Sequence, residues 1–368
     1  MKIFVVFGTR PEAIKMCPLV LQLQKQKKIT CKVCLTGQHR EMLQQVMEVF
    51  EICADYNLDI MKTGQTLTSI TADVLIKLDE ILHIEQPDLV LVHGDTSTSF
   101  AVSLACFYNG IKIGHVEAGL RTYNMFSPYP EEFNRQVVDL LADIYFAPTE
   151  MARKNLLKEN KDPEKIYITG NTVIDALNTT VQNEYFNKDL EWADGSKLIL
   201  MTAHRRENQG CVMREMFCAI RRIVEEFEDV KVIYPVHLNP MIQKVANEEL
   251  GKHERIRLIE PLNVIDFHNY MAKSFLILTD SGGIQEEAPA LGIPVLVMRN
   301  TTERPEGVEA GTLKLVGTRM EHIYQETKNL LMDKNRYHAM SHAVNPYGDG
   351  HASERIVNII LDKWKDLL

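Results

Sequence analysis

Short apolar runs alternate with longer amphipathic stretches along the first half of the chain. The runs are rich in Val, Ile, Leu and Phe, which predicts buried strands, and the stretches between them predict helices. The expected strands are 2–7, 30–35, 88–95 (ending in a polar turn), 112–116, 144–146 and 166–168, and the expected helices 11–25, 41–50, 68–82, 100–108 and 131–141. This alternation predicts a parallel sheet with helices on both faces.

A polar stretch at 178–196 interrupts the alternation and is the expected linker. A second series then follows, with the same two kinds of segment. Its expected strands are 198–201, 231–234, 256–258, 275–278 and 294–298, and its expected helices 213–226, 241–250, 264–272, one that begins at 284, and 352–367. The fold class is therefore α/β, with two Rossmann-like doubly wound domains that face a cleft.

Composition narrows the class of protein. The chain has 368 residues, 45% hydrophobic and 25% charged, which suits a globular protein of two domains. A net charge of −9 argues against a nucleic-acid-binding surface. No apolar run reaches the roughly 20 residues that span a bilayer, and residues 1–8 lead into Thr9-Arg10-Pro11 without a cleavage site. Seven scattered cysteines fit a reducing compartment, so a cytoplasmic protein without membrane contact is expected.

A glycine turn between two expected strands is the most specific local pattern. Ser281-Gly282-Gly283 follows the strand at 275–278 and opens a helix. The first amides of a helix lack partners within it and favour anions, and glycine lets a phosphate approach closely. Glu287 lies one turn into this helix, and Arg304 is a cation farther along the chain. Ser-Gly-Gly alone is also explained as a helix cap, but with these neighbours an anion site is the better interpretation.

Charged residues recur where strands of the first domain end. Arg10 follows the first strand, and Lys15 lies about one helical turn beyond Pro11, so both can offer a cation to a phosphate. Asp95, Glu117 and Glu131 follow other strands or open the next helix. Each acid alone is also explained as a cap or a complement to a helix dipole. Three at one edge of a sheet favour a site, because crowded carboxylates can divide acid and base roles.

The second domain offers histidines at corresponding positions. His204 and Arg205 follow its first strand, and His237 follows the next. A histidine beside arginines can bind or protonate an oxyanion. A metal site is the competing interpretation, but these histidines and acids lack the spacing of metal ligands, so no metal is expected.

Eight motifs in order carry a resemblance to a known family: FGTRPEAIKM, VHGDTSTSF, GHVEAGLRT, PEEFNR, TGNTVIDAL, TAHRREN, PVHLNP and DSGGIQEEAPALGIPVLVMRNTTERPE. The chain resembles the non-hydrolysing UDP-N-acetylglucosamine 2-epimerases from residue 1 to about residue 317 and in the last helix. The resemblance implies glycosyltransferase-B architecture, with a domain at 1–177 completed by helix 352–368 and a linker and UDP-binding domain at 178–351. It also implies a homodimer, no redox cofactor, and a role in polysaccharide biosynthesis.

The resemblance also implies a mechanism and residue roles. UDP leaves carbon 1 as the proton leaves carbon 2, giving 2-acetamidoglucal, and re-addition with protonation on the other face gives UDP-N-acetylmannosamine. Asp95, Glu117 and Glu131 would be the acid/base set, and His204, Arg10 and Lys15 would serve the diphosphate. The residues implied for UDP are His237, Phe267, Ser281, Gly282, Gly283, Glu287 and Arg304.

Many relatives bind a second UDP-N-acetylglucosamine as an activator. The positions implied for it are Gln38, Glu41, Glu131, Arg205 and His237. Some relatives have an arginine where this chain has Gly64, and its loss removes a cation from that site. Three alternatives to the epimerase stay open: an epimerase of a related UDP-2-acetamido sugar, a UDP-sugar glycosyltransferase, and a catalytically silent nucleotide-sugar sensor.

Overall fold

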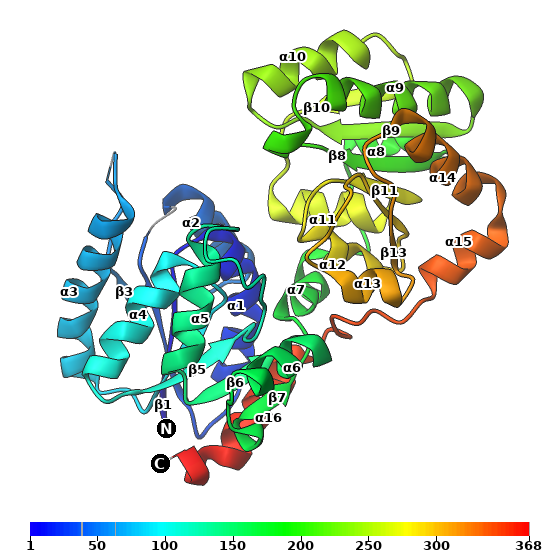
Figure 1. Ribbon diagram of the computed structural model, residues 1–368. Helices are drawn as coiled ribbons and strands as arrows, with labels where there is room; N and C mark the ends of the chain where they lie inside the picture. The colour runs from blue at the N-terminus through cyan, green and yellow to red at the C-terminus, as the bar shows by residue number, and fades with distance from the viewer. Residues whose placement is uncertain (38–39, 63, 368) are drawn as a thin grey trace. The chain divides into compact units, whose positions relative to one another are not determined.

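The computed structural model describes residues 1–37, 40–62 and 64–367, which form two compact units (Figure 1). Unit 1 comprises Met1–Thr179 with Tyr347–Leu368, and unit 2 comprises Thr180–Pro346. Each unit has a parallel sheet flanked by helices, which confirms the predicted fold class. The expected linker at 178–196 contains a helix, α8 (Lys188–Ala193), and belongs to unit 2 from Thr180 onward.

Unit 1 is built on a seven-stranded parallel sheet of order β3-β2-β1-β4-β5-β6-β7. The strands are β1 (Lys2–Phe7), β2 (Thr30–Leu35), β3 (Tyr56–Asn57), β4 (Leu89–His93), β5 (Lys112–Val116), β6 (Ile144–Ala147) and β7 (Ile166–Ile168). The helices are α1 (Arg10–Gln24), α2 (Arg40–Val49), α3 (Leu67–Glu85), α4 (Ser97–Tyr108), α5 (Glu131–Leu141), α6 (Glu150–Lys158), α7 (Thr172–Thr180) and α16 (Ala352–Leu367), with a short 3₁₀ turn at Pro163–Lys165.

Unit 2 has a six-stranded parallel sheet of order β10-β9-β8-β11-β12-β13. The strands are β8 (Lys197–Thr202), β9 (Val230–Pro235), β10 (Ile256–Ile259), β11 (Leu276–Thr279), β12 (Val295–Val297) and β13 (Leu313–Leu315). Besides α8, its helices are α9 (Cys211–Glu226), α10 (Pro240–Glu249), α11 (Val264–Ala272), α12 (Ile284–Ala290), α13 (Pro305–Glu309), α14 (Met320–Met332) and α15 (Lys334–Ser341), with a 3₁₀ turn at Arg206–Asn208.

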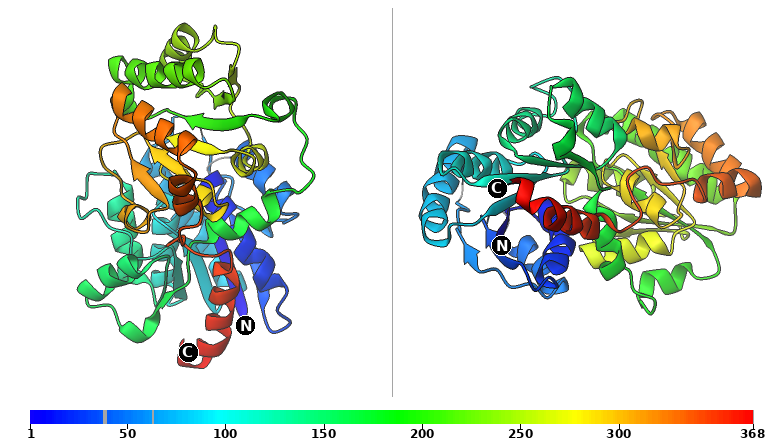
Figure 2. Two further views of the ribbon diagram at one scale, coloured as in Figure 1. Left: turned by 90° about the vertical axis from the view of Figure 1, so that its right-hand side faces the viewer. Right: turned by 90° about the horizontal axis from the view of Figure 1, so that it is seen from below.

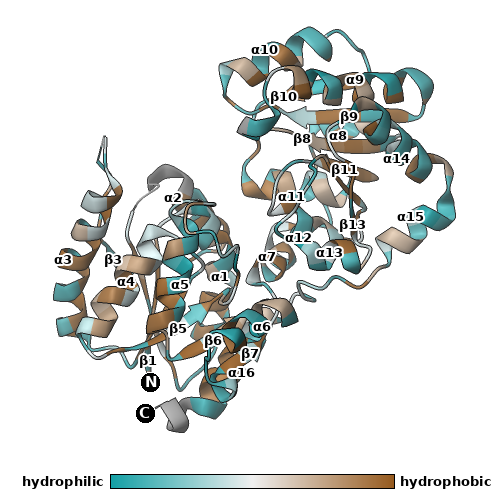
Figure 3. Cartoon of the chain, viewed as in Figure 1, coloured by the Kyte–Doolittle hydropathy of each residue, from teal (hydrophilic) through white to brown (hydrophobic). Residues whose placement is uncertain are grey.

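The cores lie where helices cover the sheets, and apolar residues, brown in the hydropathy view, recur along the strands (Figure 3). Strand β4 is buried throughout, and β1 is buried from Ile3 to Phe7. A sheet covered on both faces needs continuous apolar strands, which is the pattern that the sequence shows. Among residues 1–37, 40–62 and 64–367, no helix is long and apolar enough to cross a membrane.

Residues from both ends of the chain build unit 1. Helix α16 packs beside α1, as two further views show (Figure 2). Asp175 of α7 caps α16 by accepting from the backbone amides of Ala352 (3.1 Å) and Ser353 (2.7 Å). The amide of Asn171, just before α7, donates to the carbonyl of Tyr347 at 2.7 Å. The segment around Asn171 therefore depends on residues that follow unit 2 in the chain.

The turn after β5 requires a glycine. Gly119 has φ +87°, and a Cβ there would lie 2.3 Å from the carbonyl oxygen of Ala152. The left-handed conformation costs most other residues about 1–2 kcal/mol, and the contact with backbone atoms cannot relax by a side-chain rotation. The turn that follows Glu117 is therefore held close to α6.

We expect Gly119→Ala to lower the free energy of unfolding by about 2–5 kcal/mol, because strain in φ adds to overpacking. The measurement is the urea midpoint followed by circular dichroism. Gly110→Ala is the matched control, because Gly110 has φ +66° with no heavy atom within 4 Å of the added Cβ. Equal midpoint shifts for the two variants would contradict the steric argument.

Candidate active site

The three predicted carboxylates lie at the carboxyl edge of the unit 1 sheet. Asp95 follows β4, Glu117 follows β5, and Glu131 is the first residue of α5. Strands β4 and β5 are parallel neighbours, with His93 paired to Val116, so the residues after them emerge at the same edge. Lys15 of α1 contacts Glu117, which connects a predicted cation with a predicted acid.

Glu117 is the most constrained of these acids. Its backbone is in the left-handed region (φ +66°), and its side chain is 9% exposed. Its Oε2 accepts from Nζ of Lys15 and from Nδ2 of Asn171 (2.7 Å). Burial alone would raise the pKa of this carboxyl, but the charge of Lys15 and the hydrogen bonds from Lys15 and Asn171 outweigh burial and lower the pKa well below its ordinary value. Glu117 is thus a carboxylate in this structure.

Asp95 has a different cation. Nη2 of Arg135 contacts Oδ2 of Asp95, and Nδ2 of Asn134 donates to the Asp95 carbonyl at 2.9 Å. Both partners belong to α5, whose first residue is Glu131. The neighbouring Glu132 instead accepts from the backbone amides of Thr122 and Tyr123, each at 2.9 Å. Glu132 therefore orders the loop before α5.

Buried polar atoms without partners gather among the same residues. Within the described part of the chain, Nε2 of His93, Oε2 of Glu131 and Nε of Arg135 are buried and make no hydrogen bond. Burial lowers the pKa of His93 to about 3, more than the nearby Glu117 raises it, so its imidazole is neutral. Buried polar groups normally have partners. These orphaned atoms indicate a place for a polar ligand or for water.

Arg10 and Glu12 serve the adjacent loop. Arg10 begins α1 and is half-buried, and its guanidinium has no carboxylate partner among the described residues. Burial lowers its pKa, as expected for a cation withdrawn from water. Glu12 is buried and accepts from the amides of Gly8 (3.0 Å) and Thr9 (2.8 Å) and from the hydroxyl of Thr96 (2.6 Å). It ties the loop of Arg10 to that of Asp95.

A buried histidine-aspartate pair links the turns that follow β4 and β5. His115 and Asp139 are fully buried, and Nδ1 of His115 lies 2.6 Å from Oδ1 of Asp139. The other ring nitrogen lies 2.8 Å from the carbonyl of Gly94. Oδ2 of Asp139 also accepts from Arg121 (2.7 Å) and from the amide of Gly119 (3.2 Å). The pair thus joins the turn of Gly94 and Asp95 to the turn of Glu117 and Gly119. The sequence analysis did not predict this role.

In unit 2, a buried aspartate positions the predicted histidine. Asp280 accepts from the amides of His204 (3.0 Å) and Arg205 (3.0 Å) and from Nδ2 of Asn208 (3.0 Å). Nε of Arg205 donates back to the Asp280 carbonyl at 2.9 Å. Asp280 is fully buried, whereas His204 is exposed. The loop after β8 is thus attached to the end of β11, and the imidazole of His204 faces outward.

His237 lies beside His204. The two rings are 5.8 Å apart between centroids, and His237 is also exposed after β9. Phe267 lies on α11 and is partly exposed. The structure therefore brings the two predicted histidines together, although the strands before them, β8 and β9, are separated by α9 in the chain.

The glycine turn of unit 2 is where the sequence indicated it. Gly283 caps α12 and is exposed, and a Cβ on Gly282 would lie 2.8 Å from Nη1 of Arg304. Nε of Arg304 contacts Glu286, which is buried, whereas Glu287 is partly exposed, 3.6 Å from His268. Ser281 opens this turn, and its amide donates to Oγ1 of Thr279 at 2.9 Å. Glu286 is thus a structural partner of Arg304, and Glu287 faces the turn.

Two expected positions of the activator site cannot be placed. Gln38 lies outside the described residues, and of Glu41 only the backbone, within α2, is described. Within the described ranges no cluster of three or more His, Cys, Asp or Glu is arranged to hold a metal ion.

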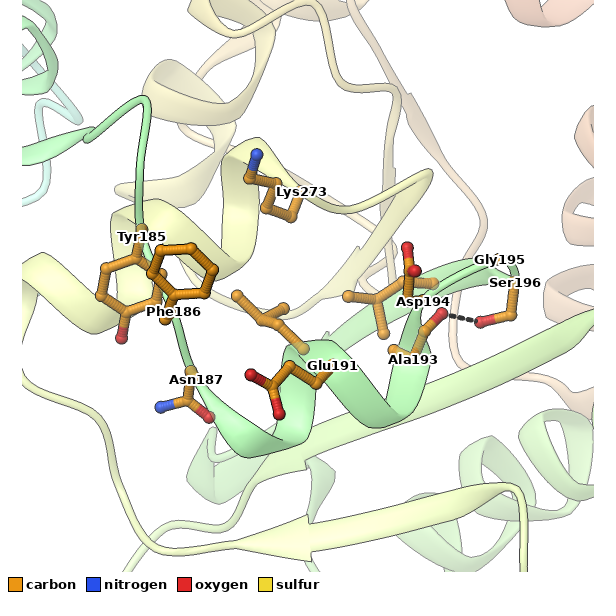
Figure 4. A pocket seen from close by; sticks show the side chains of 11 residues that line it. Tyr185, Phe186, Asn187, Glu191, Ala193, Asp194, Gly195, Ser196 and Lys273 are labelled. Atoms are coloured by element: carbon orange, nitrogen blue, oxygen red, sulfur yellow. Dashed lines mark hydrogen bonds between the residues drawn. The ribbon is translucent and has the colours of Figure 1, made fainter.

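A hollow of about 330 Å³ in unit 2 lies away from these positions (Figure 4). Tyr185, Phe186, Glu191, Asp194 and Lys273 are among the side chains around it. None of the described residues that line it was predicted for the site. It is open to solvent and forms no part of the clusters at the strand ends.

Comparison with known proteins identifies the family. The sequence model described as UDP-N-acetylglucosamine 2-epimerase matches residues 21–361. The chain belongs to this family. A Bacillus subtilis UDP-N-acetylglucosamine 2-epimerase is 61% identical over 361 residues, which are 98% of this chain and 95% of the relative.

Solved structures agree in fold. The Neisseria meningitidis UDP-GlcNAc 2-epimerase bound to UDP-GlcNAc is 49% identical, covers 98% of this chain and 100% of its own, and has a TM-score of 0.89. A glycosyltransferase from Rickettsia africae has a TM-score of 0.65 at 14% identity over 99% of both chains, a likeness of fold alone. The predicted family is confirmed, and the epimerase family shares its two-sheet architecture with a glycosyltransferase.

Loss of the Asp280 carboxylate should loosen the loop of His204. In Asp280→Asn an NH₂ group replaces one acceptor oxygen, so an amide of His204 or Arg205 loses its partner at about 1–3 kcal/mol. We expect amide hydrogen exchange in residues 203–208 to accelerate about 10- to 100-fold, measured by mass spectrometry. Asp229→Asn is the control, because Asp229 pairs with Lys197 at the surface and should leave this segment unchanged. Equal protection in both variants would remove Asp280 from this role.

Proposed function

We propose that the protein interconverts UDP-N-acetylglucosamine and UDP-N-acetylmannosamine by reversible epimerisation at carbon 2. The observation that carries the proposal is the group at the edge of the unit 1 sheet. Three carboxylates gather there with buried polar atoms that lack partners, in a chain of the UDP-N-acetylglucosamine 2-epimerase family. These are the groups that proton exchange on a sugar needs.

The proposed chemistry balances without a redox cofactor or a metal. The bond between carbon 1 and the UDP oxygen breaks, and that oxygen keeps the electron pair. A carboxylate takes the proton from carbon 2, and the electrons of that bond form the double bond of 2-acetamidoglucal. UDP then adds back to carbon 1 while a second carboxyl group delivers a proton to the other face of carbon 2. General acid-base catalysis of this kind contributes about 10²–10⁴-fold.

We propose the following residue roles in each unit. Asp95, Glu117 and Glu131 form the acid/base set of unit 1, and Arg10 and Lys15 offer cations to the diphosphate. In unit 2, His204 assists the leaving diphosphate. The glycine turn with Glu287 and Arg304 binds UDP, together with His237 and Phe267. The partly buried guanidinium of Arg10, without a carboxylate partner in the described chain, supports an anion ligand there.

We further propose a homodimer that works in the cytoplasm and supplies polysaccharide biosynthesis. The outer face of α3 and α4 exposes Ile76, Ile84, Phe107 and Tyr108, with exposed fractions from 59% to 76%. Large exposed apolar residues grouped on two packed helices are typical of an interface between subunits. All seven cysteines are free thiols, which suits a reducing compartment.

Purified protein with UDP-N-acetylglucosamine in deuterated water should replace the carbon 2 proton by deuterium and form the manno epimer, followed by ¹H NMR. Asp95→Asn, Glu117→Gln and Glu131→Gln should each slow this at least about 100-fold, because each removes a carboxylate that meets the reacting sugar. Glu150→Gln, at the exposed start of α6, is the control that should keep the wild-type rate.

Transfer of the sugar to an added acceptor without exchange would favour the glycosyltransferase alternative. Exchange with a related UDP-2-acetamido sugar, but not with UDP-N-acetylglucosamine, would favour an epimerase of that sugar. Tight binding of UDP-N-acetylglucosamine with neither exchange nor transfer would favour the nucleotide-sugar sensor.

Activation by a second UDP-N-acetylglucosamine should be weak. Gly64 has φ +74° and supplies no cation, and Arg205 is engaged by Asp280 and by Glu303 at 3.2 Å. We therefore expect initial rates to depend hyperbolically on substrate. Gly64→Arg should introduce upward curvature if the missing cation is the reason, and Gly64→Ala should not. A sigmoidal curve for the unaltered protein would contradict the inference.

A further inference from the structure

Glu117 differs from the other two proposed catalytic acids in what surrounds it. The ammonium of Lys15 and the amide of Asn171 both donate to the same oxygen, Oε2. The side chain is 9% exposed, and the one other titratable group that the described residues bring to it is the neutral imidazole of His93, 3.7 Å away. A proton on Oε2 would have to displace two donors in a nearly closed site.

The other acids are held less tightly. Asp95 meets one cation, Arg135, and its side chain is 26% exposed. Glu131 has neither a hydrogen bond nor an ion pair from its side chain to any described residue, and its Oε2 is buried. A carboxyl oxygen without a donor can accept a proton, or carry one, without breaking an existing contact. The capacity to exchange protons is therefore unequal across the three acids.

The backbone keeps Glu117 in this arrangement. Its φ of +66° is unfavourable for a residue with a Cβ, so the turn has little freedom to withdraw the side chain. Gly94 of the neighbouring turn lies against it, because a Cβ there would be 3.3 Å from Oε1 of Glu117. Asn171 is itself held by its backbone amide, which donates to the carbonyl of Tyr347. The donor and the acceptor are both fixed before substrate arrives.

We propose that Glu117 stays negatively charged throughout the reaction, held as an anion by Lys15 and Asn171, and stabilises the positive charge at carbon 1, while Asp95 and Glu131 exchange the proton at carbon 2. The proposal rests on the epimerase function and narrows the acid/base set to two residues. As UDP leaves, carbon 1 becomes electron-poor, and a fixed carboxylate nearby lowers the energy of that state without moving a proton. Asn171 is then a positioning residue that acts through Glu117.

Asn171 offers a test that leaves the proposed diphosphate ligand Lys15 unchanged. Its Oδ1 accepts from the amide of Val173 at 3.1 Å and so caps α7, whereas its Nδ2 serves Glu117. Asn171→Asp and Asn171→Ser both keep an oxygen for the cap and lose the donor to Glu117. Loss of the donor raises the pKa of Glu117 in both variants. The aspartate also adds a like charge, which raises this pKa further, whereas the serine adds no charge.

The measurement is kcat for the epimerase reaction from pH 8.5 down to the lowest pH at which circular dichroism shows each variant still folded, because the pKa of Glu117 lies well below its ordinary value. A higher pKa protonates Glu117 as the pH falls, so an anion requirement predicts that the acid-side loss of rate moves upward. We expect a shift of about one pH unit or more in Asn171→Asp and a smaller one in Asn171→Ser. A profile merely scaled by a constant factor would show Asn171 to be structural only. A gain of rate at high pH would show that Glu117 must carry a proton. Either outcome overturns the proposal.

A second measurement needs no turnover, so its failure is separate from failure of the proposed function. The δ-¹³C signal of Glu117, assigned by its loss in Glu117→Gln, should remain at the carboxylate position at pH 4.5. An ordinary glutamate, whose pKa is 4.5, is half-protonated there. A half-protonated signal in the unaltered protein would refute a permanent anion even if the enzyme epimerises its substrate. An ionised signal in a protein without epimerase activity would be consistent with a permanently charged Glu117 but would contradict the proposed epimerase function.

Discussion

Buried carboxylates that accept from backbone amides hold three loops of the candidate site. Glu12 binds the amides of Gly8 and Thr9, Glu132 those of Thr122 and Tyr123, and Asp280 those of His204 and Arg205. Losing such an acceptor leaves backbone amides unpaired in a dry environment, which costs about 1–3 kcal/mol for each unsatisfied group. Glu12, Glu132 and Asp280 therefore serve to hold loops in place, and other acids remain available to a ligand.

The division between loop-anchoring acids and the proposed acid/base residues explains what the sequence predicted and what it did not. Apolar runs identified most strands, because parallel strands are buried on both faces. The short edge strands β3 and β13 and the helices α14 and α15 were not anticipated, since brief or mixed segments show weak periodicity. The positions of candidate site residues at strand ends followed from topology alone. Which acid of a neighbouring pair anchors a loop or an arginine did not follow, because that depends on the direction of each side chain.

Two neighbouring pairs show the physical reason. Glu131 and Glu132 are adjacent on α5, and Glu286 and Glu287 on α12, so each pair is separated by about 100° around its helix. One member of each pair turns inward to amides or to an arginine, and the other stays toward the edge of the sheet. His115 and Asp139 were missed for a related reason: they lie 24 residues apart, and only the fold makes them partners.

The route of the chain through unit 1 has a consequence for biosynthesis. Unit 2 is one continuous stretch, Thr180–Pro346, inserted between the two parts of unit 1. A ribosome therefore synthesises all of unit 2 before it makes Tyr347, whose carbonyl holds Asn171, or the residues of α16 that pack on α1. While unit 2 is synthesised, the face of α1 that α16 covers in the finished protein has no partner from this chain. The order of translation thus leaves the surroundings of Glu117 to be completed last.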